Sequence, residues 1–536
     1  MKTSILIMHQ IKRIPIHKKI FNKAFASNFV ECSLTIDDIP YRRTFPVIGT
    51  KLEFIASGSG TKLHEYIDHR HKQLGPVFRE KLGGDADLVF VSDPLLIRTL
   101  LLNLEGKYPA HILPEPWVLY ENLYGSKRGL FFMNGEEWLE NRRIMNKHLL
   151  KEGSETLLEG PVKTTVRKFI QKMKYATESG TFVPNLESEF YRLSIDVIVA
   201  VILGNNSTIK PNKDCEALLT NFSESVKKIF QTTTTLYGLP LHLCQKFNLK
   251  VWRDFKESVD ISLSLAHKIV GEVLSNRHHS NGLVKMLSDE KVSDENIKKI
   301  IGDFVIAAAD TTAYTSLWTL FLLSNQENTK AEIRSRDKNY VNYILKESMR
   351  LYPVAPFLTR ILPTESVLGS YKLIAGLYLV VKMLNISIEM FCRKHISSVH
   401  TIRKYSAICG NYYKDVNNVT PIIASIYTSG RDENNFSEAE KFLPYRWDRN
   451  DPRKKKLQNH TSFASLPFAL GARSCIGKKL AILQITELIS QIVDNFEFKC
   501  LNKTEIKANT SQVLVPSTDI KLEFSRFESA SKDRSI

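Results

Sequence analysis

The chain has 536 residues, of which 43% are hydrophobic and 24% charged, a composition typical of a globular protein with a large apolar core. Its formal net charge is +17, but the basic residues are spread along the chain, with one dense run at residues 453–456. This distribution does not indicate nucleic-acid binding, and it suits an acidic protein partner or an anionic membrane surface. The seven cysteines are odd in number and show no metal-site spacing, which favours a reducing compartment.

The N-terminal segment has the composition of a targeting sequence. It is basic, is interspersed with Ile and Phe, and contains no acidic residue before Glu31. Its short apolar run at residues 5–7 is far below the roughly 20 residues that a membrane span needs. We therefore expect a mitochondrial transit peptide at residues 1–31, with a disordered basic tail as the alternative. The lack of an anchor helix argues against a form located in the endoplasmic reticulum.

The elements that follow predict a mainly helical protein with small mixed sheets. Residues 45–49 are expected to be an extended entry segment, and residues 88–91 a short strand that ends where Ser-Asp-Pro opens a helix. Helical periodicity dominates residues 138–323. Strand-like runs return at residues 361–373 and 422–427.

One long helix is expected from Asp294 to about Leu323, capped by Ser293. At 1.5 Å per residue it is about 45 Å long, enough to cross the whole molecule. Its apolar centre contains two polar residues, Asp310 and Thr311. Burying polar groups costs free energy unless they have a use, so this pair is a candidate functional site.

The most informative segment is residues 468–477, which precede a strongly periodic helix. A helix N-terminus at Cys475 favours the thiolate and lowers the proton affinity of the sulfur. Gly471 and Gly477 remove side chains on either side, so that backbone amides can approach the sulfur. Phe468 can shield it from water, and Arg473 can pair with a carboxylate. Taken alone, a buried cysteine is more often a small hydrophobic residue.

The pattern Phe468-x-x-Gly471-x-Arg473-x-Cys475-x-Gly477 resembles the haem-binding loop of the cytochromes P450. The resemblance implies the P450 fold, with a long central helix over the haem and the cysteine loop on the opposite side. It also implies one monooxygenase domain at residues 32–536, haem b as cofactor and O₂ as co-substrate. Cys475 would be the axial ligand of the iron, and a thiolate ligand favours O–O cleavage.

Further motifs match the same family in the correct order. Glu347 and Arg350 resemble its Glu-x-x-Arg helix, and Arg446 lies in a segment resembling the one that adds a second arginine to this pair. By the same resemblance, Thr311 would hydrogen-bond iron-bound oxygen and Asp310 would help to relay protons. The alternatives are a solvated surface pair for Glu347 and Arg350, and a Thr311 hydroxyl bonded to its own helix.

The haem propionates need cations or hydrogen-bond donors. Trp138 and Arg142 resemble the propionate-binding helix of the family, Arg360 matches a second propionate position and Arg473 a third. Trp138 can also be an ordinary core residue.

Basic residues indicate the branch of the family. Lys478 and Lys479, directly after the cysteine loop, resemble the mitochondrial branch, whose members receive electrons from an acidic ferredoxin and its reductase. Together with Lys346 they are candidates for a redox-partner face, although each can also be a solvated surface lysine. The implied location is the mitochondrial matrix side, with possible contact with the inner membrane and no nucleic-acid partner.

Residues 129–138 and 350–357 resemble the insect ecdysteroid hydroxylases, in particular those acting on carbon 2. The implied reaction is hydroxylation of a lipophilic, steroid-like substrate. The alternatives are a poorly active, misprocessed haem-binding isoform and a microsomal-type monooxygenase of xenobiotics or lipids.

The chain departs from the family pattern at two places. Residues 377–419, a run of 43, interrupt a family-like join and predict a retained intron or gene-model error, with a genuine surface insertion as the alternative. Only 37 positions separate Asp310 from Glu347, which suggests that a helix between them is missing or truncated.

Overall fold

The computed structural model describes residues 34–42, 49–82, 88–125, 129–204, 213–237, 239–275, 281–335, 339–373 and 420–527. The expected transit peptide at residues 1–31, most of the expected entry segment and the expected insertion at residues 377–419 lie outside the described residues.

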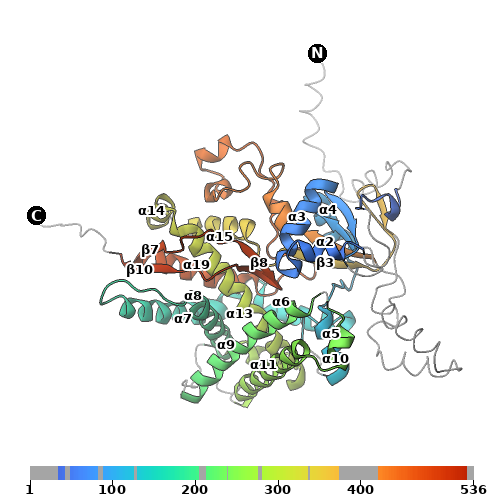
Figure 1. Cartoon of the computed structure of the whole chain (residues 1–536). Helices are drawn as coiled ribbons and strands as arrows, with labels where there is room; N and C mark the ends of the chain where they lie inside the picture. Colours follow the sequence, from blue (N-terminus) through green and yellow to red (C-terminus); the bar gives the residue numbers. More distant parts are fainter. Residues whose placement is uncertain are drawn as a thin grey trace, which may run out of the picture.

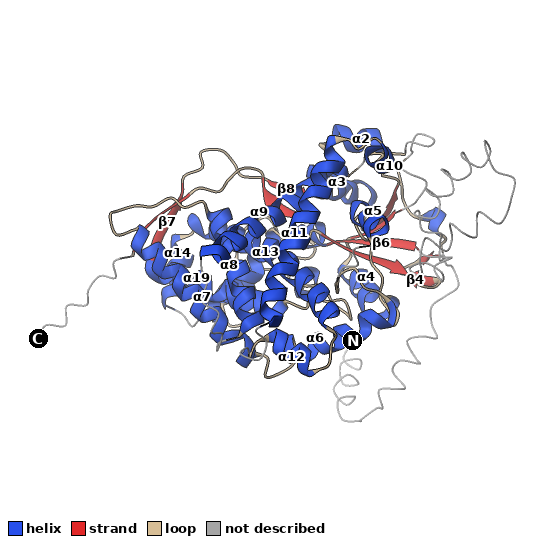
Figure 2. Cartoon of the chain, turned by 90° about the horizontal axis from the view of Figure 1, so that it is seen from below, coloured by secondary structure: helices blue, strands red, loops and turns tan. Residues whose placement is uncertain are grey.

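The described helices are α2 (Lys51–Ala56), α3 (Leu63–Leu74), α4 (Pro94–Thr99), α5 (Glu115–Tyr124), α6 (Gly135–Leu149), α7 (Glu155–Ala176), α8 (Leu186–Leu203), α9 (Lys213–Leu236), α10 (Leu241–Lys246), α11 (Lys250–Ser275), α12 (Leu283–Asp289), α13 (Asp294–Ser324), α14 (Glu327–Ser335), α15 (Asn339–Leu351), α18 (Ile426–Arg431) and α19 (Lys478–Asn495). Short helical turns are η2 (Ile36–Asp38), η3 (Ser59–Lys62), η4 (Leu100–Leu104), η6 (Pro444–Trp447), η7 (Pro452–Lys456) and η8 (Ser462–Ala464). The strands are β1 (Val77–Glu80), β2 (Leu88–Val91), β3 (Phe357–Leu362), β4 (Ser366–Leu368), β5 (Tyr371–Leu373), β6 (Thr420–Ser425), β7 (Phe496–Cys500), β8 (Ala508–Ser511), β9 (Val513–Pro516) and β10 (Leu522–Arg526). Figure 2 shows that helices make up most of the molecule, with strands confined to small sheets, which confirms the predicted fold class.

The largest sheet in the described part of the chain joins segments that are far apart in the sequence. Its four strands have the order β1-β2-β6-β3. β2 pairs in parallel with β6, while β1 and β3 lie antiparallel to their neighbours at the two edges. Helices α3 and α4 lie beside this sheet (Figure 1). The other sheets are the hairpins β4-β5 and β8-β9 and the pair β7-β10.

The strand expected at residues 422–427 is present as β6, but it begins two residues earlier, at Thr420, and the expected end is wrong. β6 ends at Ser425, whose hydroxyl is 2.8 Å from His71 Nε2, and the chain then turns into helix α18. Ile426 and Thr428 stay buried in that helix. A short apolar run has no periodicity that separates strand from helix, so the sequence could not place this boundary.

The predicted long helix is confirmed as α13, which is 31 residues long. The hydroxyl of its N-cap residue, Ser293, accepts a hydrogen bond of 3.3 Å from the amide of Asn296. α13 passes through the centre of the molecule and contacts α8, α9, α11, α15 and α19 (Figure 1). Its central position brings Asp310 and Thr311 into the protein interior, as the predicted length requires.

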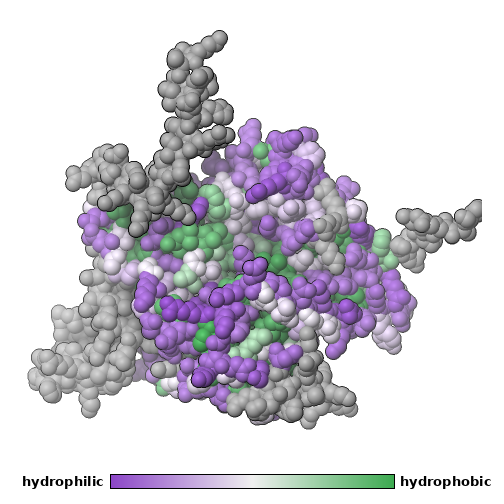
Figure 3. Space-filling model, turned by 180° about the vertical axis from the view of Figure 1, so that it is seen from behind, coloured by the Kyte–Doolittle hydropathy of each residue, from purple (hydrophilic) through white to green (hydrophobic). Residues whose placement is uncertain are grey.

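Between α13 and α15 the described residues contain one helix, the nine-residue α14. The short spacing between Asp310 and Glu347 therefore leaves room for a single short helix there. The face of the molecule in Figure 3 is mainly hydrophilic, with apolar patches between the hydrophilic areas. Among the described helices, none is long and apolar enough to cross a membrane.

Candidate haem-thiolate site

The cysteine loop is a tight turn that leads into α19. The Cys475 amide donates to the Phe468 carbonyl at 2.8 Å, and the Ser474 amide donates to the Gly471 carbonyl at 3.2 Å. α19 begins at Lys478 with Gly477 as its N-cap residue, so the sulfur lies at the N-terminal end of the helix. A Cβ placed on Gly477 would lie 3.6 Å from the Phe304 ring of α13 and 4.0 Å from the Cys475 sulfur, so both helices adjoin the thiol.

The helix end acts on Cys475 in the expected direction, through the Gly477 amide, but burial outweighs it in the protein alone. Part of the side chain is accessible, but protein surrounds the thiol, and this desolvation raises its pKa. The Gly477 amide and the charges of Arg142 and Lys478 act in the opposite direction and do not outweigh burial. The thiolate therefore needs a cation bound directly to the sulfur, because a coordinated metal deprotonates a thiol outright.

Gly471 is required for a reason other than the one expected. Its φ is +77°, and a Cβ at this position would lie 2.1 Å from the Leu101 carbonyl oxygen and 2.4 Å from Glu105 Oε1. The amide of Ala472 donates to the same Glu105 oxygen at 2.8 Å. Gly471 thus lets the cysteine loop pack directly on η4 and the residue after it, rather than opening space around the sulfur.

Arg473 ties the cysteine loop to the segment before α6. Its guanidinium donates to the carbonyls of Pro109 at 2.7 Å and Met133 at 2.8 Å, and to Asn134 Oδ1 at 2.8 Å. It also lies 4.3 Å from the ring centre of Trp138, which is 1% exposed. Most donors of Arg473 are therefore engaged within the protein, so its contribution to an anion site is smaller than expected.

Two other predicted cations keep buried nitrogen atoms without a protein partner. Arg142 Nη2 donates to the Ser474 carbonyl at 2.5 Å, while its Nε is buried and unpartnered. Arg360 Nε pairs with Glu105 Oε2 at 2.7 Å, while its Nη2 is buried and unpartnered. A buried donor without an acceptor costs about 1–3 kcal/mol, so these atoms fit an anionic group supplied by a ligand.

A third such group, His111, was missed from the sequence. Both of its ring nitrogens are buried without a partner, and burial together with the charges of Arg473 and Arg360 lowers its pKa to about 3. The neighbouring amide of Ile112 donates to Thr359 Oγ1 at 3.0 Å, which fixes His111 beside strand β3. No motif or periodicity marked this residue, because its position depends on pairing with a strand about 250 positions away.

These donors fit the haem that the cysteine loop implies. The macrocycle carries two carboxylates, and the donors of Arg142, Arg360 and His111 are suited to carboxylate oxygens. Cys475 places its sulfur in the same region, because Arg142 contacts its neighbour Ser474. A cysteine at a helix N-terminus with buried cations and donors around it defines a haem-thiolate site.

Asp310 and Thr311 face different surroundings on α13. Asp310 is 1% exposed, its Oδ2 has no partner, and burial followed by the charge of Glu187 raises its pKa well above the usual carboxyl value. Thr311 is half-buried, and its hydroxyl donates to the Ala307 carbonyl at 2.9 Å. The structure thus shows the Thr311 hydroxyl bonded to its own helix, which is one of the two expected arrangements. Its oxygen can still accept a hydrogen bond from another group.

The structure brings Glu347, Arg350 and Arg446 together in a fully buried cluster. Glu347 Oε1 lies 2.8 Å from Arg350 Nη2 and 2.9 Å from Arg446 Nε, and all three side chains are 0% exposed. Burial alone would raise the pKa of Glu347, but the Arg350 hydrogen bonds and the two positive charges outweigh it and lower the pKa. The remaining arginine donors hold backbone carbonyls of residues 430–441, so the cluster anchors the chain ahead of the cysteine loop.

The three lysines proposed for the partner face differ in their surroundings. Lys478 is exposed, whereas Lys479 pairs with Glu155 at 2.7 Å and donates to the Lys151 carbonyl at 2.8 Å. Burial and the charges of Lys478 and Arg449 lower the pKa of Lys346, which shows that positive charge is concentrated there.

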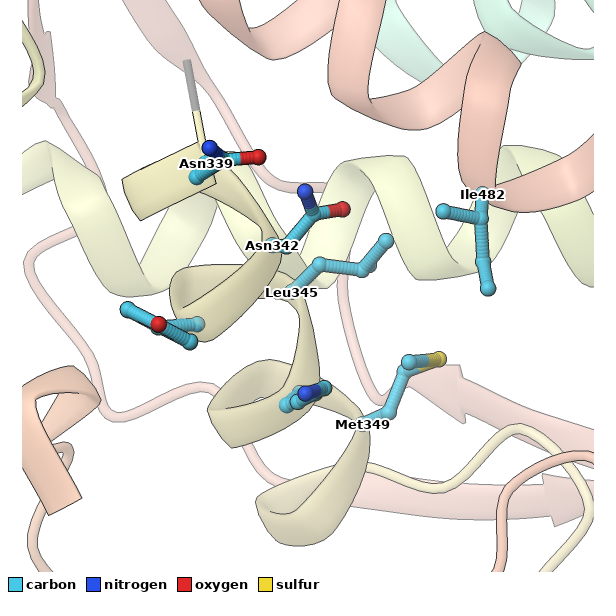
Figure 4. Close-up of a pocket in the computed structure, with 7 residues that line it drawn as sticks. Asn339, Asn342, Leu345, Met349 and Ile482 are labelled. Atoms are coloured by element: carbon cyan, nitrogen blue, oxygen red, sulfur yellow. The ribbon is translucent and has the colours of Figure 1, made fainter. Parts of the chain in front are cut away.

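Lys346 also lines an open pocket of about 400 Å³ between α15 and α19. In Figure 4, Leu345 and Met349 of α15 point toward Ile482 of α19 across this pocket. Lys346 and Lys478 therefore belong to one basic surface at the end of α19, whereas Lys479 is largely neutralised.

Comparison with known proteins agrees with this class of site. The sequence model of the family described as Cytochrome P450 matches residues 39–388 and 406–524, and the chain belongs to the cytochrome P450 family. The break in the match, residues 389–405, falls inside the segment at residues 377–419. Membership makes the chain a monooxygenase that uses haem b and O₂.

Its relatives are mitochondrial enzymes. The chain is 36% identical over 506 residues to Cytochrome P450 315a1, mitochondrial, of Drosophila melanogaster, covering 90% of this chain and 88% of that protein. It is 25% identical over 509 residues to the 1,25-dihydroxyvitamin D(3) 24-hydroxylase, mitochondrial, of Rattus norvegicus, covering 91% and 89%. It is 24% identical over 494 residues to the cholesterol side-chain cleavage enzyme, mitochondrial, of Oncorhynchus mykiss, covering 86% and 84%. The predicted mitochondrial branch and placement are confirmed.

Proposed function

We propose that this monooxygenase hydroxylates a steroid, specifically carbon 2 of an ecdysteroid, with electrons from a mitochondrial ferredoxin and its reductase. The observation that carries the chemistry is Cys475 at the N-terminus of α19, beside buried donors that lack protein acceptors. The substrate class is supported by the similarity of residues 129–138 and 350–357 to ecdysteroid hydroxylases, and by relatives whose names include a vitamin D hydroxylase and a cholesterol side-chain cleavage enzyme.

Each site residue has a role in holding the cofactor. Cys475 would ligate the iron, Arg142, Arg360 and His111 would hold the propionates, and Phe468 and Trp138 would shield the cofactor and sulfur from water. When bound, the haem supplies the activation of O₂, and its thiolate ligand favours cleavage of the O–O bond. Gly477 keeps the first turn of α19 open toward the sulfur, so that its amide can temper the charge on the ligand.

Asp310 and Thr311 would serve the proton requirement of the reaction. Conversion of RH and O₂ to ROH and H₂O consumes two electrons and two protons, and the protons must arrive without general entry of water. Burial and the charge of Glu187 raise the pKa of the Asp310 carboxyl, which favours its protonated form and so its use as a proton donor. Thr311 accepts and donates through a single hydroxyl that turns about its Cβ–Oγ bond, so it can pass a proton one step toward the reacting oxygen.

A basic surface around Lys346 and Lys478 would dock the acidic ferredoxin. Opposite charges increase the association rate, and added salt screens them. Lys479 contributes less because Glu155 already neutralises it.

Purified protein should be supplied with ferredoxin, its reductase, NADPH and labelled O₂, and given an ecdysteroid that lacks the 2-hydroxyl group. The proposal expects a product with one labelled oxygen atom at carbon 2, formed in the presence of the ferredoxin system and absent with a microsomal flavoprotein reductase. Turnover of other steroids without this product would overturn the assigned position. Haem binding without turnover of any steroid would support the alternative of a poorly active isoform.

A further inference from the structure

A chain of polar groups leads from Asp310 to the surface through residues with no role in the family motifs quoted above. Asp310 Oδ2 is buried without a partner, and Tyr314 follows it by one turn of α13 on the same face. Tyr314 is itself only 6% exposed. Two buried groups that can ionise thus lie one helical turn apart, and each disfavours ionisation of the other.

Tyr314 connects α13 to α8. Its hydroxyl donates to Glu187 Oε1 at 2.8 Å, and the Tyr191 ring packs edge-on against the Tyr314 ring with centres 5.8 Å apart. Glu187 lies in the first turn of α8 and its side chain is 18% exposed. The phenol therefore has a fixed position between the interior of α13 and a carboxylate near the surface.

Glu187 connects in turn to solvent. Lys227 of α9 lies with Nζ 2.6 Å from Glu187 Oε1, and the Lys227 side chain is 40% exposed. Exposure thus rises in order from Asp310 through Tyr314 and Glu187 to Lys227. Helices α13, α8 and α9 thus contribute a row of groups that can each accept or release a proton, with Asp310 one helical turn from Tyr314.

The charges along this line keep protons at its inner end. Burial raises the pKa of Tyr314, and the charges of Asp310 and Glu187 raise it further, with a smaller contribution from Asp519. The same burial and the charge of Glu187 raise the pKa of Asp310. Both inner groups are therefore harder to ionise, while Lys227 pairs with the outer carboxylate of Glu187.

We infer that Tyr314 and Glu187 form the proton-supply path that recharges Asp310 from the surface at Lys227. The inference rests on the proposed proton-donating role of Asp310. Glu187 first takes a proton from solvent, directly or through Lys227, which then regains one from solvent. After Asp310 releases its proton toward Thr311, its O–H bond is restored by the Tyr314 proton, while Tyr314 takes the proton held by Glu187. Each group returns to its starting state, one proton enters per passage, and no electron moves through these residues.

The direction of one hydrogen bond changes during this passage. At rest the Tyr314 hydroxyl donates to Glu187. Once Glu187 is protonated it becomes the donor, and the Tyr314 O–H turns toward the unpartnered oxygen of Asp310. Tyr314→Phe removes the hydroxyl and keeps the ring that packs on Tyr191, so it interrupts the path with little change in packing.

The test compares Tyr314→Phe and Glu187→Gln with the control Glu189→Gln. Glu189 lies on the same turn of α8, but its carboxylate pairs with Lys172 at 2.7 Å, whereas the Tyr314 hydroxyl donates to Glu187. With saturating ferredoxin, both relay variants should lose about 100-fold in kcat, the lower end of general acid–base effects, with little change in KM and a larger solvent isotope effect. Unchanged kcat and isotope effect in Tyr314→Phe would overturn the inference.

Two further measurements distinguish loss of the proton path from a structural defect and from failure of the proposed function. Hydrogen peroxide carries oxygen, electrons and protons together, since RH and H₂O₂ give ROH and H₂O. Peroxide-driven turnover should therefore be retained in both relay variants, and its loss in parallel with the ferredoxin-driven rate would mean a structural defect. Without any turnover, infrared spectra should show a protonated-carboxyl band that Asp310→Asn removes and Tyr314→Phe shifts. If Tyr314→Phe leaves the band in place, Tyr314 and Asp310 are not coupled. The proposed proton path is then wrong, and this conclusion does not depend on the identity of the substrate.

Discussion

Glu347→Gln is the perturbation whose cost the structure defines most closely. The carboxylate accepts five hydrogen bonds, from Arg350 Nε and Nη2, Arg446 Nε, the amide of Leu443 and Trp447 Nε1. The side chain is 0% exposed, so water cannot replace a lost acceptor. The substitution keeps the shape but removes the charge and turns one acceptor oxygen into a donor. Breaking a buried pair from one side costs about 3–5 kcal/mol, and we expect a loss of this size in the free energy of unfolding.

Urea unfolding followed by circular dichroism measures this loss. The matched control is Glu159→Gln, which removes an exposed pair with Lys163 at 2.7 Å and should leave the midpoint unchanged, because exposed pairs contribute little. If Glu347→Gln is no more destabilising than this control, the buried cluster does not organise the fold and our reasoning about it is wrong.

The pH dependence of this difference has a defined sign. The pKa of Glu347 is lower in the folded protein than in the unfolded chain, because Arg350 and Arg446 outweigh the effect of burial. Its stabilisation is therefore complete above the unfolded value, about 4.3, and is lost as pH falls through the lower folded value. The gap between wild type and Glu347→Gln should be full at pH 7 and should shrink in acid.

His111→Ala should release haem to a scavenging apoprotein about 10- to 150-fold faster, because a donor to a carboxylate contributes about 1.5–3 kcal/mol; an unchanged rate would remove His111 from the propionate site. Lys478→Gln should raise the ferredoxin KM at low salt more than Lys479→Gln does, and equal effects would contradict the assigned basic surface. Gly471→Ala should lower the thermal midpoint by several degrees more than Gly153→Ala, because both have a positive φ but only Gly471 also meets a neighbour; equal shifts would mean that the close approach to η4 is unimportant.

Local chemistry made much of the fold predictable. The Ser293 cap and the long apolar run fixed α13 almost to the residue, and the Asp-Pro pair marked the start of α4 at Pro94. The Cys475 loop was identifiable because its residues are contiguous. Glu347 and Arg350 could be paired because a helix places residues three apart on one face.

Other features depend on contacts that the sequence does not encode locally. The raised pKa of Cys475 comes from the protein around it, and Gly471 is explained by a carbonyl some 370 positions earlier. Arg473 donates to backbone carbonyls, and the ring nitrogens of His111 lack protein partners. Both facts depend on how residues 109–125 and 129–134 pack against the loop. These are tertiary properties, and spacing along the chain gives no access to them.

The insertion at residues 377–419 stays a prediction. Sequencing of the transcript would decide its origin, and spliced message that still encodes these residues would contradict the retained-intron hypothesis.

The measurement that tests the central assignment most directly is the Soret band of the reduced, carbon monoxide-bound protein, expressed from about Cys32 onward. A thiolate-ligated haem gives a red-shifted band that a histidine-ligated haem does not. We predict this band in the wild-type protein, or in the protein lacking residues 377–419 if the insertion prevents folding, and its loss in Cys475→Ala. A red-shifted band that survives in Cys475→Ala, or its absence from both the full and the shortened chain, would contradict the assignment of Cys475 as the haem ligand.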